Sequence, residues 1–380
     1  MDEVRRRSLF MAAGAAGLAA LPGMAAAQLQ SQTATGPEVK ATHKIRFGVI
    51  GLDHYHIFSM TAAVQRGGGE LVAFHATDPR QIADFRRRFG EVKLARSEDE
   101  ILDDLSIQLI AGAPIPDLRT PLGIKAMRRG KDYLADKPGI ITLEQLAEVR
   151  RTVKETGRKF AIMYSERLEV PAAVKAGELI KAGAIGKVVQ TVNLAPHQTN
   201  APNRPAWFWD PDRYGGILTD IGSHQADQFL YYTGSKSARV VASQVGNVAN
   251  GDHPRFQDFG DMTVTGDGGT GYIRVDWYTP DSLKTWGDGR LFILGTEGYI
   301  ELRKYIDIAG RPGKDHLFLV DAKGTHYIDC TDQPLFYGRA LIDDVLNRTE
   351  TAMPQARCFK AMELALTAQQ MAERGTDWAQ

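Results

Sequence analysis

The stretch Ile45-Arg46-Phe47-Gly48-Val49-Ile50-Gly51-Leu52-Asp53-His54-Tyr55-His56 decides the class of fold. Its first six residues are mostly apolar, which is typical of a strand that is buried on both faces. A helical pattern follows the glycine at the end of this run and continues to about Arg66, where Gly67-Gly68-Gly69 stops it. A buried strand, a tight glycine turn and a helix form the first unit of a doubly wound parallel sheet.

The same alternation of strand and helix continues to about residue 165. Further strands are expected at 71–74, 107–110, 133–135 and 160–163, and helices at 79–89, 118–129 and 143–155. Strands that are separated by helices predict an α/β domain with a doubly wound parallel sheet over residues 44–165. Ligands of such sheets bind at the carboxyl ends of the strands.

The pattern changes after residue 165. One helix is expected at 172–181, β-rich runs at 187–195, 238–247, 261–266, 271–278, 290–295 and 298–303, and two closing helices at 338–347 and 356–373. Gly-rich turns such as Gly266-Asp267-Gly268-Gly269 join several of the runs without a helix between them. Residues 166–380 are therefore predicted to be an α+β domain with a large, mostly antiparallel open sheet.

The composition is that of an ordinary globular protein. The 380 residues fit two domains, and 46 Lys and Arg residues balance 46 Asp and Glu residues. A net charge of zero argues against a general binder of polyanions, so no nucleic acid partner is expected. Cys330 and Cys358 are too few for a disulfide-stapled fold, and whether they pair stays open.

The N-terminal residues are predicted to be a targeting segment. Arg5-Arg6-Arg7-Ser8-Leu9-Phe10 precedes an Ala-rich apolar run and Ala25-Ala26-Ala27, so residues 1–27 resemble a twin-arginine signal peptide. The apolar run is too short for a stable membrane anchor, and residues 28–43 are expected to be a flexible leader. The twin-arginine route carries folded proteins, and the expected destination is the periplasm.

The first turn departs from an ordinary dinucleotide site. Such a site uses three glycines, and this chain keeps Gly51 but has Asp53 at the second position and His56 at the third. A carboxylate at the second position disfavours a diphosphate unless the carboxylate is neutralised or turned away. The acidic residue expected at the end of the second strand is replaced by Ala76. No metal site is predicted, because His54 and His56 beside Asp53 on one turn rarely converge on one ion.

Three later motifs, taken together, resemble those of the Gfo/Idh/MocA oxidoreductases. Residues 126–138, AMRRGKDYLADKP, resemble the family's AGKHVxxEKP block, with Asp136 in place of Glu. Tyr164-Ser165-Glu166-Arg167-Leu168, with 183–188, resembles its YxxRF…GxIGxI block. Residues 215–227, GGILTDIGSHQAD, resemble its GGGxLxDxGxHxxD block. The motifs occur in the family's order, and the resemblance covers about residues 44–380.

The resemblance implies a Rossmann-type domain, bound NAD or NADP, and a sugar, polyol or related carbonyl substrate. By position, Lys137, Asp220 and His224 match the family's catalytic residues, whereas Arg119 stands where the family usually has His. The expected cofactor-binding residues are Gly48, Gly51, Asp53, His54, His56, Asp136, Lys137 and Pro138. A homodimer or homotetramer is also implied, because the open sheet would otherwise expose an apolar face.

The chemistry of these residue types agrees with the implied roles. Oxidation of an alcohol removes an O–H proton, and the imidazole of His224 suits that task because histidine titrates near neutrality. The ammonium of Lys137 suits polarisation of a carbonyl oxygen, and Asp220 lies one helical turn before His224 if a helix begins there. Taken singly, such residues are more often surface, cap or loop positions. The expected substrate contacts are Tyr164, Arg167, His197, Arg204 and Trp207.

The predicted function is an exported NAD(P)-dependent oxidoreductase of a sugar, polyol or glycoside. Since the periplasm maintains no pool of free nicotinamide cofactor, the nucleotide is expected to stay tightly bound and to be recycled in each catalytic cycle. Two alternatives stay open. One is a redox-neutral glycoside hydrolase of the same fold, and the other is a non-catalytic sugar-binding protein that has lost its cofactor.

Overall fold

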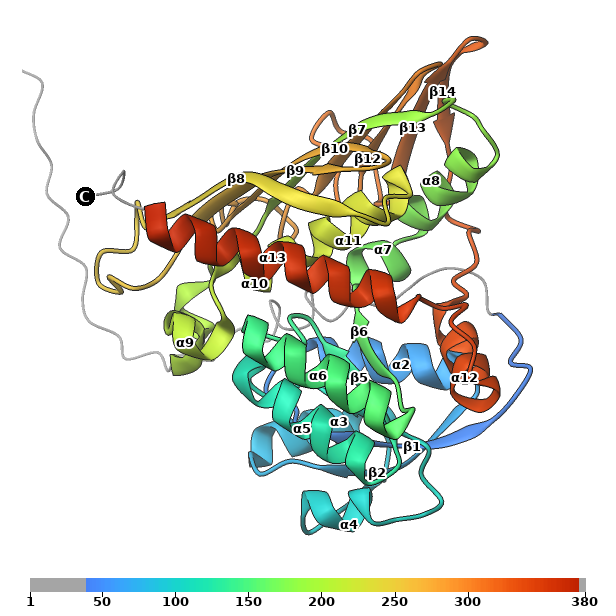
Figure 1. Cartoon of the computed structure of the whole chain (residues 1–380), viewed down its shortest axis with the longest axis vertical. Helices are drawn as coiled ribbons and strands as arrows, with labels where there is room; N and C mark the ends of the chain where they lie inside the picture. Colours follow the sequence, from blue (N-terminus) through green and yellow to red (C-terminus); the bar gives the residue numbers. More distant parts are fainter. Residues whose placement is uncertain (1–38, 376–380) are drawn as a thin grey trace, which may run out of the picture.

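The computed structural model describes residues 39–375, so the predicted signal peptide and most of the predicted leader lie outside the described residues. Figure 1 shows two sheets, with the helices of the N-terminal half below and the larger sheet above. The long C-terminal helix crosses between them. This arrangement confirms the prediction of a parallel α/β domain followed by a domain with a large, mostly antiparallel sheet.

The first sheet is wholly parallel and has the strand order β3-β2-β1-β4-β5-β6. Its strands are β1 (Ile45–Ile50), β2 (Gly69–His75), β3 (Lys93–Leu94), β4 (Leu109–Gly112), β5 (Asp132–Asp136) and β6 (Phe160–Met163). Its helices are α2 (His56–Arg66), α3 (Pro79–Phe89), α4 (Glu98–Leu102), α5 (Pro116–Arg128) and α6 (Leu143–Thr156). The sequence did not predict β3 or α4, and it placed β4 two residues too early.

Local sequence explains where these helices begin and end. The side chain of Asp78 accepts a hydrogen bond from the Arg80 amide, and Pro79 occupies the first turn of α3. Thr142 caps α6 in the same way, and Gly157 ends that helix in the left-handed conformation. Asp78 is thus engaged as a helix cap at the end of β2.

The second sheet has eight strands in the order β14-β13-β12-β11-β7-β10-β9-β8. Its strands are β7 (Val188–Pro196), β8 (Ala238–Gly246), β9 (Phe259–Gly266), β10 (Gly269–Asp276), β11 (Arg290–Gly295), β12 (Tyr299–Arg303), β13 (His316–Asp321) and β14 (Gly324–Ile328). All pairs are antiparallel except β7 with β10, which is parallel. The hairpin of β13 and β14 was not predicted.

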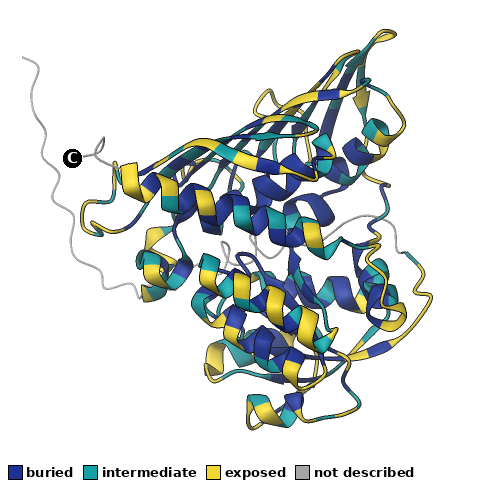
Figure 2. Ribbon diagram, in the orientation of Figure 1, coloured by how far each residue is buried: buried dark blue, intermediate teal, exposed yellow. Residues whose placement is uncertain are grey.

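Helices cover one face of this sheet and leave the other open. The connecting helices are α7 (Ser165–Leu168), α8 (Pro171–Lys181), η1 (Ala201–Asn203), η2 (Ala206–Trp209), α9 (Pro211–Tyr214), α10 (Ile217–Asp220) and α11 (Gly222–Thr233). α11 contacts β7 and β10, and its side chains are almost all buried (Figure 2). On the opposite face, Phe292, Leu294 and Tyr299 are exposed apolar side chains. Such a face suits the predicted oligomer, which stays a prediction.

The chain ends by returning to the N-terminal half. α12 (Tyr337–Asn347) packs against α2, and α13 (Gln355–Gly375) contacts β8, α11, α6 and β6. Cys330 and Cys358 are both buried and both free. Among the described residues, no helix has the combination of length and apolar character that crossing a bilayer requires.

Candidate functional site

A cavity of about 430 Å³ lies at the carboxyl ends of the parallel strands, where the two domains meet. Asp53 and Lys137 enter it from just after β1 and β5, and Glu166 enters it from α7, just after β6. The second domain supplies further lining residues: His197, Arg204, Trp207, Asp220, His224, Trp277, Trp286, Lys304 and Tyr305. This is the edge at which a doubly wound sheet binds its ligands.

The three predicted catalytic residues meet in this cavity. Lys137 is buried, and its Nζ donates to Asp220 Oδ1 at 3.0 Å. His224 is 2% exposed and lies near the start of α11. Asp220 ends the separate short helix α10, so the expectation that one helix face carries both residues is wrong. Asp220 thus pairs with the ammonium of Lys137.

Electrostatics keeps the site in a defined protonation state. Burial alone would raise the pKa of Asp220, but the ammonium of Lys137 outweighs it and holds that pKa below its ordinary value. Burial lowers the pKa of His224 to about 3, although the nearby Glu166 carboxylate acts in the opposite direction. At neutral pH the cavity therefore holds an ionised Asp220 and an uncharged His224 imidazole.

A buried ion pair lies beneath His224. Lys304 Nζ donates to Glu166 Oε2 and to Gln228 Oε1, both at 2.8 Å, and the Lys304 side chain is fully buried. Burial alone would raise the pKa of Glu166, but Lys304 and the histidines His224 and His197 hold it well below its usual range. Sequence patterns predicted no role for Glu166 or Lys304. The one signal in the sequence is that Glu166 lies inside the motif of residues 164–168.

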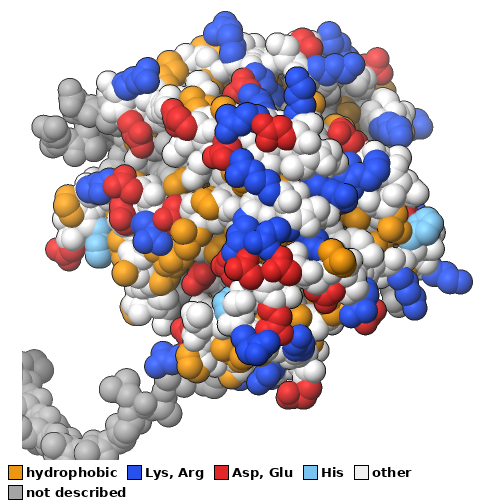
Figure 3. Space-filling view, turned by 60° about the horizontal axis from the view of Figure 1, so that its bottom comes forward, with side chains coloured by type: hydrophobic (Ala, Val, Ile, Leu, Met, Phe, Trp, Pro, Cys, Tyr) orange, Lys and Arg blue, Asp and Glu red, His pale blue; other side chains and the backbone are white. Residues whose placement is uncertain are grey.

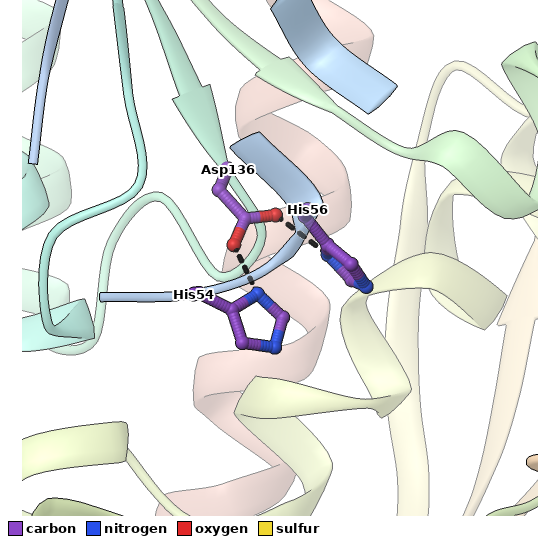
Figure 4. Close-up of side chains that lie close together, drawn as sticks. All are labelled: His54, His56 and Asp136. Carbon is purple, nitrogen blue, oxygen red and sulfur yellow. Dashed lines mark hydrogen bonds and ion pairs between the residues drawn. The ribbon is translucent and has the colours of Figure 1, made fainter. Parts of the chain in front are cut away.

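Two histidines of the glycine turn converge on one carboxylate from 80 residues later in the chain (Figure 4). Asp136 accepts from His54 Nδ1 at 2.6 Å and from His56 Nδ1 at 2.8 Å. Arg119 Nη2 lies 3.0 Å from the same carboxylate. Burial would raise the pKa of Asp136, but the Arg119 guanidinium and both imidazoles hold it well below its usual range. Asp136, a predicted cofactor-binding residue, contacts these three side chains, and its role toward a cofactor stays a prediction.

Arg119, which stands where the family usually has histidine, makes buried contacts with two neighbouring backbone segments. Its side chain is fully buried, its Nε donates to the Pro114 carbonyl at 2.8 Å, and its Nη1 donates to the Lys137 carbonyl. The guanidinium therefore connects the start of α5 with the end of β5. The Arg119 side chain fixes the backbone at Lys137, and its positive charge balances the negative charge of Asp136.

The glycine turn keeps its shape but not its usual donors. Gly51 has φ of +80°, and a Cβ at this position would lie 2.7 Å from Pro114 Cβ, so only glycine fits. Asp53 accepts from the Gln81 side chain and the Ile115 amide, and burial raises its pKa above its ordinary value. These contacts turn Asp53 toward donors of the chain itself, which is the condition set by the sequence analysis for a diphosphate nearby.

The predicted substrate residues divide into two groups. His197, Arg204 and Trp207 line the cavity. Tyr164 and Arg167 do not line it, so the structure does not support their predicted contact with substrate. Tyr164 is fully buried and donates to the Cys358 carbonyl at 3.3 Å, and Arg167 pairs with the fully buried Asp227 at 2.5 Å. They face the core because the chain turns into α7 directly after β6.

Four predicted cofactor residues also lie outside the cavity lining: Gly48, Gly51, Asp136 and Pro138. Gly48 lies in the middle of β1, where a Cβ would clash with Ile101 Cγ2 at 2.4 Å, so its role is to allow close packing. Pro138 follows a cis peptide bond after Lys137, and its carbonyl accepts from Arg119 Nη1 at 3.2 Å.

Figure 3 shows Lys and Arg side chains interspersed with Asp and Glu on the face in view, in keeping with the balanced charge of the chain.

Two protein-family models match the chain. Residues 45–164 match the oxidoreductase family with an NAD-binding Rossmann fold, and residues 173–301 match the GFO/IDH/MocA C-terminal domain. The first match spans the N-terminal domain, and the second spans part of the C-terminal domain.

Two of the curated relatives carry the names of carbohydrate or polyol enzymes. The scyllo-inositol 2-dehydrogenase (NAD(+)) of Bacillus subtilis (strain 168) is 27% identical over 294 residues, which span 75% of this chain and 79% of that protein. The 1,5-anhydro-D-fructose reductase of Ensifer adhaerens is also 27% identical, over 52% of this chain and 59% of that protein.

Solved structures agree over nearly the whole described chain. A candidate oxidoreductase from Erwinia carotovora atroseptica SCRI1043 is 46% identical, with a TM-score of 0.84, and the match covers 87% of this chain and 99% of that one. A levoglucosan dehydrogenase in complex with NADH and levoglucosan is 17% identical, with a TM-score of 0.73 over 88% and 98% of the two chains, and shows the shared fold alone. The chain belongs to the Gfo/Idh/MocA family of oxidoreductases, whose N-terminal domain is an NAD-binding Rossmann fold.

Proposed function

We propose that this chain is an exported NAD(P)-dependent oxidoreductase that acts on a CH–OH group of a sugar, polyol or glycoside, with a tightly held nucleotide. The observation that carries the proposal is the Lys137–Asp220 ion pair beside the buried, uncharged His224 in one cavity between the two domains. The names of the relatives favour a polyhydroxylated substrate. Export rests on the N-terminal sequence alone.

The residues present fit a nicotinamide nucleotide at one end of the cavity better than at the other. The Gly51 turn retains the backbone conformation that a dinucleotide needs, and Lys137 is buried at the end of β5. At the diphosphate end, Asp53 is engaged with donors of the chain itself, but His54 and His56 line the cavity with ring nitrogens that can accept, where a diphosphate needs donors. The nicotinamide half is therefore assigned to the Lys137 end. The diphosphate half would need hydrogen-bond donors from other parts of the chain.

When bound, the nicotinamide ring accepts or supplies the hydride. Lys137 donates a hydrogen bond to the substrate oxygen and stabilises the negative charge that develops there. Asp220 holds the ammonium in place through the 3.0 Å contact. His224 takes the hydroxyl proton in oxidation, since its imidazole is uncharged, and returns the proton in reduction. Glu166 stabilises the imidazolium that forms, because its carboxylate charge acts on His224.

Aromatic and cationic side chains form the wall on which a sugar ring would lie. Arg204 lies over the rings of Phe208 and Trp277, at 4.2 and 4.9 Å from their centroids. His197 packs against Trp286 with ring centroids 4.4 Å apart. An apolar face with hydrogen-bonding groups at its rim matches the two sides of a sugar ring.

The first test is the nucleotide content of the purified, signal-processed chain. Mass spectrometry of the supernatant after heat denaturation is expected to show NAD(H) or NADP(H) at close to one per chain. If the protein carries no nucleotide, and binds neither on addition, the cofactor assignment is wrong and the sugar-binding alternative takes its place.

The second test addresses the residues. Lys137→Met is expected to lower kcat by about 100- to 1,000-fold, the usual loss when one preorganised donor is removed. The matched control is Lys131→Met, because Lys131 is also buried but donates to the Asp104 carbonyl away from the cavity. Full turnover in a folded Lys137→Met protein contradicts the assigned role, as does a comparable loss of turnover in the control.

A further inference from the structure

We propose that His54 and His56 bind a divalent transition-metal ion of the Zn²⁺ class through their Nε2 atoms, with Asp136 holding both imidazoles from behind. This site goes beyond the proposed function and does not depend on it, because metal binding can be measured without nucleotide or substrate. It also differs from the sequence prediction of no metal, which paired the two histidines with Asp53.

The contacts of Asp136 determine which nitrogen of each ring carries the proton. An ionised carboxylate only accepts hydrogen bonds, so His54 and His56 must each carry their proton on the Nδ1 atom that faces Asp136. In the neutral form of each ring, the Nε2 atom is then an acceptor with a free lone pair. Figure 4 shows both Nε2 atoms on the sides of the rings that face away from Asp136.

The two acceptors are close together and face open space. The ring centroids are 4.1 Å apart, and both side chains line the cavity. Within residues 39–375, no donor forms a hydrogen bond with either Nε2 atom. One potential ligand atom from each of His54, His56 and Asp136 lies within 4.8 Å of the others. Two neighbouring imidazoles whose Nε2 atoms have no donor are complementary to a cation.

The hydrogen bonds of His54 and His56 to Asp136 are those typical of metal-bound histidines. Imidazoles that bind a metal nearly always donate their other N–H to a carboxylate or carbonyl, which fixes the ring and raises its basicity. Here one carboxylate serves both rings, and Arg119 and the Lys137 amide in turn hold that carboxylate. The imidazoles thus bond to a buried carboxylate that is itself bonded to two further groups. Histidines without a ligand would not need to be held in this way.

The positive charges near His54 and His56 are paired with carboxylates and do not exclude a cation. Arg119 is paired with Asp136 and Lys137 with Asp220, so each nearby positive charge has its own carboxylate. Asp53 lines the same cavity and carries no ion pair with a described residue. Imidazole ligands select Zn²⁺ and similar ions over Mg²⁺. The remaining coordination positions face the cavity and would hold water.

The test is metal binding by the untagged chain after treatment with a chelator. Titration calorimetry with ZnCl₂ is expected to show one saturable site per chain, and MgCl₂ is expected to show none. His54→Gln and His56→Gln are each expected to weaken Zn²⁺ binding by at least about 100-fold, and Asp136→Asn by about 10- to 100-fold. His75→Gln serves as the matched control, since His75 lies in the same domain outside the cavity and bonds the Ala95 carbonyl.

A second measurement keeps the proposal testable if a variant does not fold. X-ray absorption at the zinc edge of the wild-type complex is expected to show two imidazole ligands, and the Co²⁺ complex is expected to show ligand-field bands. Absence of a saturable site in the wild type, a spectrum without imidazole, or equal affinity in folded His54→Gln and His56→Gln proteins would overturn the proposal.

Discussion

Lowering the pH from 7 to 5 is expected to destabilise the folded chain, because the cavity holds histidines that stay uncharged while the chain is folded. Burial is the main reason why the pKa of His224 falls to about 3 and that of His197 to about 4. An exposed histidine has a pKa of about 6.5. Below that pH the unfolded chain takes up protons that the folded chain does not, so the free energy of unfolding decreases as the pH falls.

The size of the effect follows from these values. Between pH 7 and pH 5, an unfolded histidine gains most of a proton, whereas folded His224 and His197 gain almost none. Each residue then contributes roughly 2 kcal/mol over this interval, and the two together about 4 kcal/mol. The carboxylates with lowered pKa values, Asp220 and Glu166, act mainly below pH 5. Burial also lowers the pKa of His54 to about 3, which adds to the loss of stability in this window, and raises that of Asp315 to about 6, which opposes it. Comparison with a His224 variant therefore isolates the contribution of that residue.

Urea denaturation of the metal-free, full-length chain, followed by circular dichroism at pH 7, 6 and 5, measures this dependence. His224→Gln is expected to remove about 2 kcal/mol of it, since glutamine does not titrate in this range. An unfolding free energy that is equal at pH 7 and pH 5 would refute the reasoning. So would a folded His224→Gln protein with the pH dependence of the wild type.

Two structural predictions follow from buried contacts. Arg167→Met leaves Asp227 buried without its partner and is expected to lower the free energy of unfolding, measured by urea denaturation, by about 3–5 kcal/mol. Arg150→Met breaks an exposed pair with Glu363 and is expected to lower it by under about 1 kcal/mol. Equal losses contradict this ranking. Gly51→Ala is expected to lower the thermal midpoint, because alanine at φ of +80° costs about 1–3 kcal/mol and its Cβ meets Pro114; an unchanged midpoint argues against the turn geometry.

Much of the fold could be predicted from local patterns. The runs that became β5 and β6 are short, apolar and bounded by glycine or polar residues, and α3 and α6 carry their own caps. The missed elements are those with little local signal. β3 has two residues, and the hairpin of β13 and β14 lies at the edge of the sheet, where pairing with β12 rather than a long apolar run defines it.

The candidate site shows the same division. Motif order alone brought together Lys137, Asp220 and His224, and the structure places all three around one cavity. The Glu166–Lys304 pair joins residues 138 apart in the chain, and no spacing rule predicts such a contact. Tyr164 and Arg167 were misjudged because a position after a strand end does not determine whether the side chain points to the cleft or to the core.

Local sequence patterns predicted most strands and helices in their order, the glycine at the first turn and the types of titratable residue present, since these depend on neighbours within a few positions. Which partner each titratable group meets depends on the tertiary structure. Asp136 illustrates the reason: its pKa, and the protonated nitrogen of both His54 and His56, depend on contacts with residues 80 or more positions away and with Arg119. Only the folding of the chain brings these charges into a common buried environment, where their interactions are strong.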